Sequence, residues 1–270
     1  MTRILMIVLT VLLSACASGP RIDTSQNALS QESRVRYLVL HYTFLDSPTS
    51  LRVLTQQGVS SHYLLDDGND FRIYRLVDEN RRAYHAGLSS WKGNTNLNSS
   101  SIGIEIVYLG WRNTDQGPVW LSYPQGQIDH LIELVRDIVK RHEITPDRVL
   151  GHSDIAPQRK QDPGPMFPWK QLADAGLVLW PDEKEVALRQ PAFERELPSV
   201  PWFQKKLAEH GFAIAQGGEL DAATRNVLIA FQMKYRAAKF DGTPDAQTAA
   251  ILDVLTRPAK AVTQTTMPAK

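Results

Sequence analysis

The stretch "RVRYLVLHYT", residues 34–43, decides the fold prediction. Positions 37–40 are apolar without a break, so a strand here would present apolar side chains on both of its faces. Strands of this kind lie inside a sheet that is covered on both sides. His41 follows directly, so a buried strand ends by delivering an imidazole to the edge of the sheet.

The rest of this region alternates between strand and helix patterns. Residues 127–143 carry apolar side chains at helical spacing along one stripe, which predicts a long amphipathic helix. The order of elements predicts an α/β domain over residues 34–176, with a mixed central sheet flanked by helices. The other expected elements are a helix at 50–57 and strands at 60–66, 71–77, 101–109 and 147–152.

His41, His152 and Asp162 form a candidate metal site. Each histidine follows an apolar strand, and Asp162 lies ten residues beyond His152 on a loop stiffened by prolines. Two imidazoles and one carboxylate leave one tetrahedral position free for water, which is the arrangement of a catalytic zinc site. Spacing alone leaves open the alternative that these side chains are grouped by chance.

Glu105 lies in the middle of the expected strand 101–109, where isoleucines at 102, 104 and 106 occupy the opposite face. One interpretation is a surface strand that exposes a carboxylate. However, the strand is otherwise apolar on both faces, and burial shifts the pKa of a carboxyl group. We therefore expect Glu105 to line a pocket.

Three segments resemble the signature segments of a known enzyme family: "YLVLHYT" (37–43), "SIGIEI" (101–106) and "GHSDIAPQRKQDPGPMFPW" (151–169). They are similar to those of the zinc N-acetylmuramoyl-L-alanine amidases of the phage-lysozyme type, which include the peptidoglycan recognition proteins. The resemblance covers residues 34–176. It implies hydrolysis of the amide bond between N-acetylmuramic acid and L-alanine in peptidoglycan and muropeptides, with Zn²⁺ as the cofactor.

The same resemblance implies roles for individual residues. The zinc ligands would be His41, His152 and Asp162, the general base Glu105, and the group beside the scissile carbonyl Lys160. Zinc lowers the pKa of a bound water, and a carboxylate can move its proton, so these roles are chemically consistent.

The predicted substrate-binding residues are His85, Tyr42, Asn96 and Ala156. For His85 the resemblance supports this role, because relatives carry a histidine at the edge of the cleft here; the alternative is a loop histidine satisfied by the backbone. One departure is Ser61, because phage members of the family carry a tyrosine with a catalytic role at this position. That role is absent here or belongs to another group.

Two other functions are alternatives. A peptidoglycan-binding protein on the same fold would bind the wall without cutting it, but such proteins characteristically lack a complete set of zinc ligands, and this chain has the full set. A zinc peptidase would instead cut within the stem peptide, and its products would differ.

The C-terminal part predicts a second, smaller all-α domain of three helices at 198–257, after a charged linker at 177–197. The segments "LDAATRNVL" (220–228) and "PDAQTAAIL" (244–252) each place an aspartate where it can cap a helix. This region resembles the three-helix peptidoglycan-binding domain. The alternative is a helical addition that only packs against the catalytic domain. Residues 258–270 are expected to be a disordered tail.

The first 16 residues, "MTRILMIVLTVLLSAC", are typical of a signal segment. Their apolar run is too short to cross a hydrocarbon core of about 30 Å as a helix. The tetrad ending in Cys16, the only cysteine, resembles the lipobox of bacterial lipoproteins, which implies a lipidated Cys16; an ordinary secretory signal is the alternative. Ala17 after the cysteine predicts an outer-membrane lipoprotein facing the periplasm. Residues 17–33 are expected to form a flexible tether.

The charge balance excludes broad electrostatic recognition. The chain has 30 basic and 29 acidic residues and a formal net charge of +1, so no extended field attracts nucleic acid. We therefore expect a locally recognised peptidoglycan substrate, membrane association through the lipid alone, no nucleic-acid partner, and a monomer.

Overall fold

The computed structural model describes residue 20 and residues 22–257, and residues from Ser33 onward form one compact unit. The predicted signal segment with Cys16 and the predicted tail at 258–270 lie outside the described residues. Between residues 22 and 32 the chain forms no helix or strand. In the described part of the chain, no helix has the length and apolar character needed to cross a membrane.

A five-stranded sheet forms the centre of the fold, with strand order β3-β2-β6-β1-β9. β1 (Tyr37–Tyr42) lies between β6 (Ser101–Ile106) and β9 (Val149–Gly151) and pairs in parallel with both. β2 (Tyr63–Leu65) pairs in parallel with β6, and β3 (Ile73–Arg75) is an antiparallel edge strand. The prediction of a mixed central sheet is confirmed. β2 and β3 are shorter than predicted because only three residues of each pair with the other.

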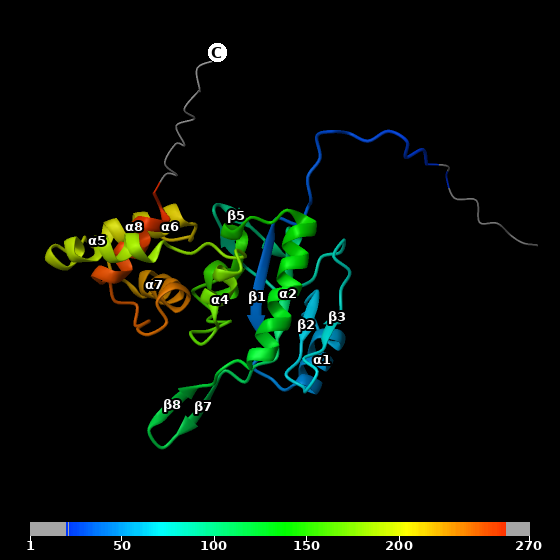
Figure 1. The fold of residues 1–270 in the computed structure, drawn as a ribbon, viewed down its shortest axis with the longest axis horizontal. Helices are drawn as coiled ribbons and strands as arrows, with labels where there is room; N and C mark the ends of the chain where they lie inside the picture. The colour runs from blue at the N-terminus through cyan, green and yellow to red at the C-terminus, as the bar shows by residue number, and fades with distance from the viewer. Residues whose placement is uncertain (1–19, 21, 258–270) are drawn as a thin grey trace, which may run out of the picture. The chain divides into compact units, whose positions relative to one another are not determined.

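Helix α2 (Gln125–His142) covers one face of this sheet, and Figure 1 shows it running alongside β1. Its apolar stripe packs on the strand residues that point to the same side. Basic residues in its last turn interact favourably with the negative end of the helix dipole. The core between α2 and the sheet includes Leu38, Leu40, Ile102, Ile104, Ile106, Ile128, Leu131, Val135 and Ile138.

Four helices pack together in the C-terminal part: α5 (Glu183–Arg195), α6 (Val200–His210), α7 (Ala222–Tyr235) and α8 (Ala246–Leu255). We call them the helical module. The predicted linker at 177–197 contains α5, so most of this connection is helical. The Asp182 side chain accepts hydrogen bonds from the first-turn amides of α5, and the helix packs against α8. Asp221 and Asp245 cap α7 and α8, as the sequence predicts.

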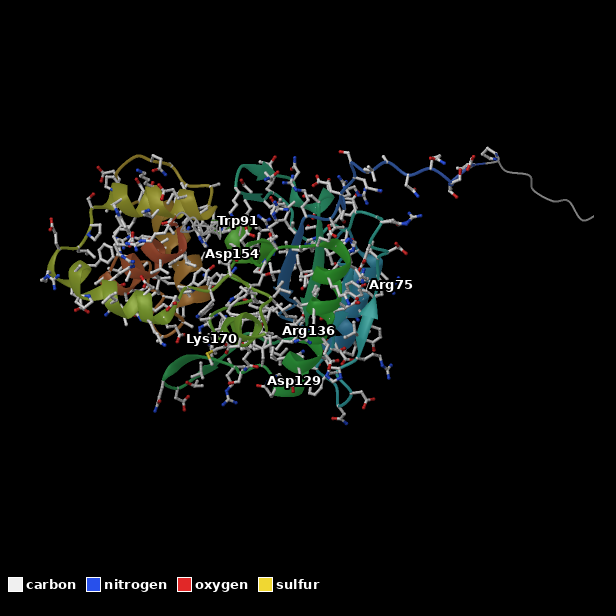
Figure 2. All side chains as sticks on the ribbon, turned by 45° about the horizontal axis from the view of Figure 1, so that its top comes forward. Arg75, Trp91, Asp129, Arg136, Asp154 and Lys170 are labelled. Carbon is white, nitrogen blue, oxygen red and sulfur yellow. The ribbon has the colours of Figure 1, made fainter. Side chains whose placement is uncertain are left out.

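The helical module shares a hydrophobic core with the second face of the sheet. Tyr37 and Val39 of β1 and Leu150 of β9 point to the side opposite α2. They belong to one continuous buried cluster with module residues, among them Phe203, Leu207, Val227, Phe231 and Leu252. Trp91, which is 1% exposed, lies where the sheet part meets the module (Figure 2). The two sequence regions therefore fold against each other.

Shorter elements connect these layers. A hairpin of two strands extends away from the central sheet in Figure 1 and carries the exposed side chains of Trp111 and Val119. The remaining elements are α1 (Ser47–Gln56), β4 (Ser90–Trp91), β5 (Asn94–Thr95), η1 (Leu97–Ser99), the hairpin strands β7 (Trp111–Thr114) and β8 (Gly117–Trp120), η2 (Pro146–Arg148), α3 (His152–Ile155) and α4 (Trp169–Asp174).

Replacing Leu131 tests the packing of α2. Leu131 is fully buried, so Leu131→Ala should lower the free energy of unfolding by about 2–5 kcal/mol in urea denaturation. Arg136→Ala, on the exposed side of the same helix, should change it by less than about 0.5 kcal/mol. Similar small losses in both variants would contradict the packing of this face.

Candidate active site

Strand register places His41 and Glu105 side by side. The two residues are partners in the parallel pairing of β1 and β6, and both point to the face opposite α2. Because parallel strands end at the same edge of a sheet, the imidazole and the carboxylate meet at that edge. Glu105, which the sequence predicts to line a pocket, is half-buried and lines a cavity beside this edge.

His152 and Asp162 come from the segment that follows β9. His152 begins the single turn of α3, whereas the sequence predicted the end of a strand followed by a loop. The chain then returns, and the amide of Ser153 donates to the carbonyl oxygen of Asp162 at 2.9 Å. This bond brings the aspartate back beside the histidine ten residues earlier.

The side chains of His41, His152 and Asp162 converge on one buried point. Nδ1 of His41 lies 2.9 Å from Nδ1 of His152 and 3.1 Å from Oδ2 of Asp162. Nδ1 of His152 lies 3.0 Å from the same oxygen. The exposed fractions of the three residues are 1%, 3% and 7%. Three potential ligand atoms therefore form a nearly equilateral triangle away from solvent.

A chain of hydrogen bonds assigns the tautomer of His41. The hydroxyl of Ser101 donates to the carbonyl of Leu97 at 2.6 Å, so its oxygen is free to accept from Nε2–H of His85 at 3.1 Å. Nδ1 of His85 must then accept, and Nε2–H of His41 donates to it at 3.0 Å. As a result, Nδ1 of His41 carries an unprotonated lone pair that faces the triangle.

A backbone carbonyl fixes the tautomer of His152 in the same way. Its Nε2–H donates to the carbonyl oxygen of Ala86 at 3.2 Å, which leaves Nδ1 unprotonated. The amides of His85 and Ala86 donate to Oδ1 of Asn98 at 3.0 and 2.7 Å, so this asparagine holds the turn that presents the carbonyl. Arg159 also donates to the Ala86 carbonyl.

This donor set fits a zinc ion. Ligands at bond lengths of about 2.0–2.2 Å around tetrahedral zinc lie roughly 3.3 Å from one another, close to the separations in the triangle. Two neutral imidazole nitrogens and one carboxylate oxygen are ligands that zinc accepts, and each imidazole donates its other N–H to a fixed partner. The residues present therefore suit a divalent transition metal with an open fourth position.

Burial and neighbouring charge set the protonation states. Burial, together with neighbouring His152, lowers the pKa of His41 to about 4, which keeps this imidazole neutral at pH 7. For Glu105, burial and the charge of Asp162 raise the pKa to about 8 against the opposing effect of Lys160.

The triangle opens into a cavity of about 770 Å³. Most of the predicted site residues line it, namely Tyr42, His85, Glu105, His152, Lys160 and Asp162. Burial and the charge of Asp162 raise the pKa of Tyr42 to about 12, so its hydroxyl stays protonated. The cavity volume is in the range typical of small-ligand sites.

Asn96 and Ala156, predicted to bind substrate, do not line this cavity. Asn96 adopts a left-handed backbone conformation before η1, where its main chain shapes a turn. Ala156 is 7% exposed and packs in the core shared with the helical module, while its carbonyl accepts from the amides of Arg159 and Lys160. Their substrate-binding roles stay predictions.

His62 is a satisfied core histidine. Its Nδ1 accepts from the amide of Gly103 at 3.0 Å and its Nε2–H donates to the carbonyl of Arg81 at 3.1 Å, so neither nitrogen is free for a metal. Gly103 is required for close packing, because a Cβ here would lie 2.5 Å from the ring of His85.

Sequence reasoning missed Asn98, Ser101 and Arg159. Their hydrogen bonds hold His85 and the carbonyl of Ala86, which in turn orient the two candidate ligand histidines. A weak signal for Ser101 was present, because it begins the "SIGIEI" segment that resembles the amidase family. Their partners are backbone groups and a histidine distant in sequence, so the pattern of residues could not show the contacts.

Comparison with known proteins agrees with this geometry. The family model described as N-acetylmuramoyl-L-alanine amidase matches residues 31–165, and the one described as peptidoglycan binding domain matches residues 196–252. The chain is 39% identical over 263 residues to N-acetylmuramoyl-L-alanine amidase AmiD of Escherichia coli (strain K12), covering 91% of this chain and 94% of that protein.

Two solved structures are similar over most of the chain. The complex of E. coli AmiD with anhydro-N-acetylmuramic acid-L-Ala-D-γ-Glu-L-Lys matches with a TM-score of 0.79 and 38% identity, covering 88% of this chain and 94% of that one. AmpDh3 of Pseudomonas aeruginosa in complex with anhydromuramic pentapeptide matches with a TM-score of 0.80 and 40% identity, covering 87% and 96%.

Removing the Ser101 hydroxyl tests the tautomer chain. In Ser101→Ala, Nε2–H of His85 loses its acceptor and His41 loses its fixed tautomer, so affinity for Zn²⁺ should fall about tenfold or more in competition with a chelator. Ser99→Ala, an exposed serine two residues away, serves as the control and should bind Zn²⁺ as the parent protein does. Unchanged affinity in Ser101→Ala would refute the assignment.

Proposed function

Because the chain belongs to the N-acetylmuramoyl-L-alanine amidase family, we propose that its cavity hydrolyses the amide between the lactyl group of N-acetylmuramic acid and L-alanine. The observation that carries this proposal is the buried triangle of His41, His152 and Asp162 with Glu105 and Lys160 in the same cavity. The activity is that of an N-acetylmuramoyl-L-alanine amidase, acting on peptidoglycan and on soluble muropeptides.

We assign zinc as the metal held by His41, His152 and Asp162, with support from the donor set and the separations of its atoms. When bound, zinc supplies a Lewis acid that polarises the amide carbonyl and lowers the pKa of water in the site. His85 and the Ala86 carbonyl keep the two imidazoles in the tautomers that such binding requires.

Glu105 is the proposed general base and then the general acid. Its place beside His41 in the strand register puts the carboxyl next to the metal site, and a pKa raised by burial suits proton exchange near neutral pH. It takes a proton as water adds to the carbonyl carbon. It returns this proton to the nitrogen as the C–N bond breaks, releasing the amine of L-alanine and a lactyl carboxylic acid, which loses its remaining proton to become a carboxylate.

Lys160 and Tyr42 are proposed to act on the substrate oxygen. The Lys160 side chain lines the cavity two residues before Asp162, where its ammonium can stabilise the negative charge that develops on the carbonyl oxygen. The hydroxyl of Tyr42 remains protonated at neutral pH and can donate a hydrogen bond in the same space. No covalent intermediate is needed.

Anhydromuramyl peptides are within the proposed substrate class. The similar E. coli and P. aeruginosa structures were each solved with an anhydromuramic peptide, which supports a role in cell-wall recycling for this chain. The match of residues 196–252 to a peptidoglycan binding domain supports a second contact with the wall polymer. Such a contact would raise the local concentration of catalytic sites near their bonds.

Product analysis tests the activity. Purified protein with sacculi or muropeptides should release peptides that begin with L-alanine, as identified by mass spectrometry, and a chelator should abolish the release until Zn²⁺ is added back. Peptides cut within the stem would indicate a zinc peptidase instead. Binding to sacculi without any release would indicate the non-catalytic alternative.

Glu105→Gln separates chemistry from metal binding. Because the amide side chain cannot exchange the proton, turnover should fall about 10²-fold or more while Zn²⁺ content stays the same. Glu133→Gln on the exposed side of α2 is the matched control and should retain full turnover. Loss of Zn²⁺ from Glu105→Gln would make Glu105 a ligand and overturn this role.

We further propose that the protein is a monomeric lipoprotein. Acylated Cys16 would anchor it in the outer membrane, and the folded part would face the periplasm. The lipobox resemblance and the peptidoglycan substrate support this location. Two or three acyl chains, at about 0.8 kcal/mol per buried CH₂, would anchor it essentially permanently.

Replacing Cys16 tests the anchor. Cys16→Ser should prevent acylation and move the protein from the outer-membrane fraction to the soluble fraction, with turnover of soluble muropeptides unchanged. Ser18→Ala, just beyond the acylation site, should remain in the membrane fraction. Recovery of Cys16→Ser in membranes would show that lipid on this cysteine is not the anchor.

A further inference from the structure

Helix α7 of the helical module reaches the catalytic cavity. Asn226 lines this cavity, and its amide nitrogen donates to Oε1 of Gln158 at 3.0 Å. Gln158 in turn donates to the carbonyl of Ala223, also at 3.0 Å. Gln158 lies two residues before Lys160 on the segment that joins His152 to Asp162, so part of the cavity wall comes from the second sequence region.

The other end of α7 makes a buried ionic contact with the sheet part. Nζ of Lys234 lies 2.7 Å from Oδ2 of Asp154 and 3.3 Å from the carbonyl oxygen of Val149. It also lies 4.3 Å from the centroid of the Trp169 ring. Lys234 is 5% exposed and Asp154 is 1% exposed, and Figure 2 shows Asp154 between the helical module and the sheet. Removing one partner would leave the other charge buried and unpaired.

Asp154 connects this contact to a metal ligand. The oxygen that accepts from Lys234 also accepts from the amide of Gly151 at 2.8 Å. Gly151 directly precedes His152, and Asp154 thereby closes the turn that begins with this ligand. The position of the His152 imidazole thus depends on a carboxylate whose charge is balanced only by α7 among its described contacts.

Ordinary packing between two folded parts would not require such a contact. Arg236, two residues beyond Lys234, is buried to a similar extent at 9% exposure, but it pairs with Asp245 at 2.8 Å inside the helical module. The two cations therefore differ in what they hold. Arg236 makes an ion pair within the helical module, whereas Lys234 makes one with the segment that carries His152.

We propose that α7 is part of the active site: Lys234 positions His152 through Asp154, and Asn226 with Gln158 forms the wall that binds the stem peptide. This inference rests on the proposed amidase function. Two side-chain amides offer both donors and acceptors, which suits the amide groups of a peptide. Another part of the lining contains Phe44 and Trp111, with ring centroids 6.1 Å apart, and aromatic faces suit a sugar ring instead.

Zn²⁺ affinity of full-length variants tests the positioning role. Lys234→Met should weaken Zn²⁺ binding about tenfold or more, the usual size of an effect on a group that orients a ligand. Arg236→Met should lower the melting temperature while leaving Zn²⁺ affinity unchanged. Equal Zn²⁺ affinities in the two variants would overturn the positioning role of Lys234.

A double variant covers the case in which Lys234→Met fails to fold. Lys234→Met combined with Asp154→Asn removes both buried charges, so much of the lost stability should return. Because the link to α7 is still missing, Zn²⁺ binding should stay weaker than in the parent protein. Full recovery of Zn²⁺ affinity would show that Lys234 matters for stability alone and would overturn this part of the proposal.

Kinetics with two substrates test the side of the cavity that Asn226 and Gln158 form. Asn226→Ala should raise KM for an anhydromuramyl tripeptide about fivefold, the value of one hydrogen bond, with kcat and Zn²⁺ affinity unchanged. KM for N-acetylmuramoyl-L-alanine, which lacks the longer stem, should not change. Arg225→Ala, an exposed neighbour on α7 outside the cavity lining, is the control and should behave as the parent protein. Equal KM values for Asn226→Ala and Arg225→Ala would overturn the wall assignment.

Failure of the two proposals can be told apart. If the parent protein releases no peptide that begins with L-alanine, the amidase function is refuted. The proposed binding of the stem peptide by Asn226 and Gln158 is then refuted as well. The Zn²⁺ affinities of the Lys234 and Arg236 variants are measured without substrate, so they still decide whether α7 positions His152.

Discussion

Two imidazole nitrogens and one carboxylate oxygen held 2.9–3.1 Å apart inside the protein are the constraint on which the surrounding structure depends. Burying such groups is costly unless each has partners for its hydrogen-bonding atoms. A metal can use the triangle only if both Nδ1 atoms are unprotonated, so the opposite Nε2–H groups need fixed acceptors. His85 and the carbonyl of Ala86 are those acceptors.

Other residues hold these two acceptors in place. Ser101 fixes the tautomer of His85, and Asn98 holds the turn that presents the Ala86 carbonyl. Gly103 leaves the space that the His85 ring occupies. All three lie on η1, β6 or between them, in the segment that also carries Glu105. One short segment therefore supports the metal ligands and supplies the proposed base.

The helical module is bound to this centre by more than a tether. Its helices share a continuous apolar core with β1 and β9, the strands that precede His41 and His152. The Lys234–Asp154 pair is buried where the two parts meet. Desolvated ionic contacts are strongly destabilising when one partner is lost, so the arrangement of the two parts is well defined. Peptidoglycan binding and catalysis are thus proposed for one body, with the two sites at fixed separation.

The sequence by itself determined the sheet domain, its amphipathic helix and the capped helices α7 and α8, and its resemblance to the amidases pointed to the candidate metal ligands. These features depend on local periodicity, on capping chemistry and on ligand types that a single segment displays, as in the apolar run before His41. The tertiary structure alone decided that Ser101 and Asn98 support the two histidines, that α5 lies in the expected linker, and that Lys234 pairs with Asp154. The physical reason is that these contacts join residues far apart in the chain, often through backbone carbonyls and amides, which every residue type carries and which no sequence pattern can identify.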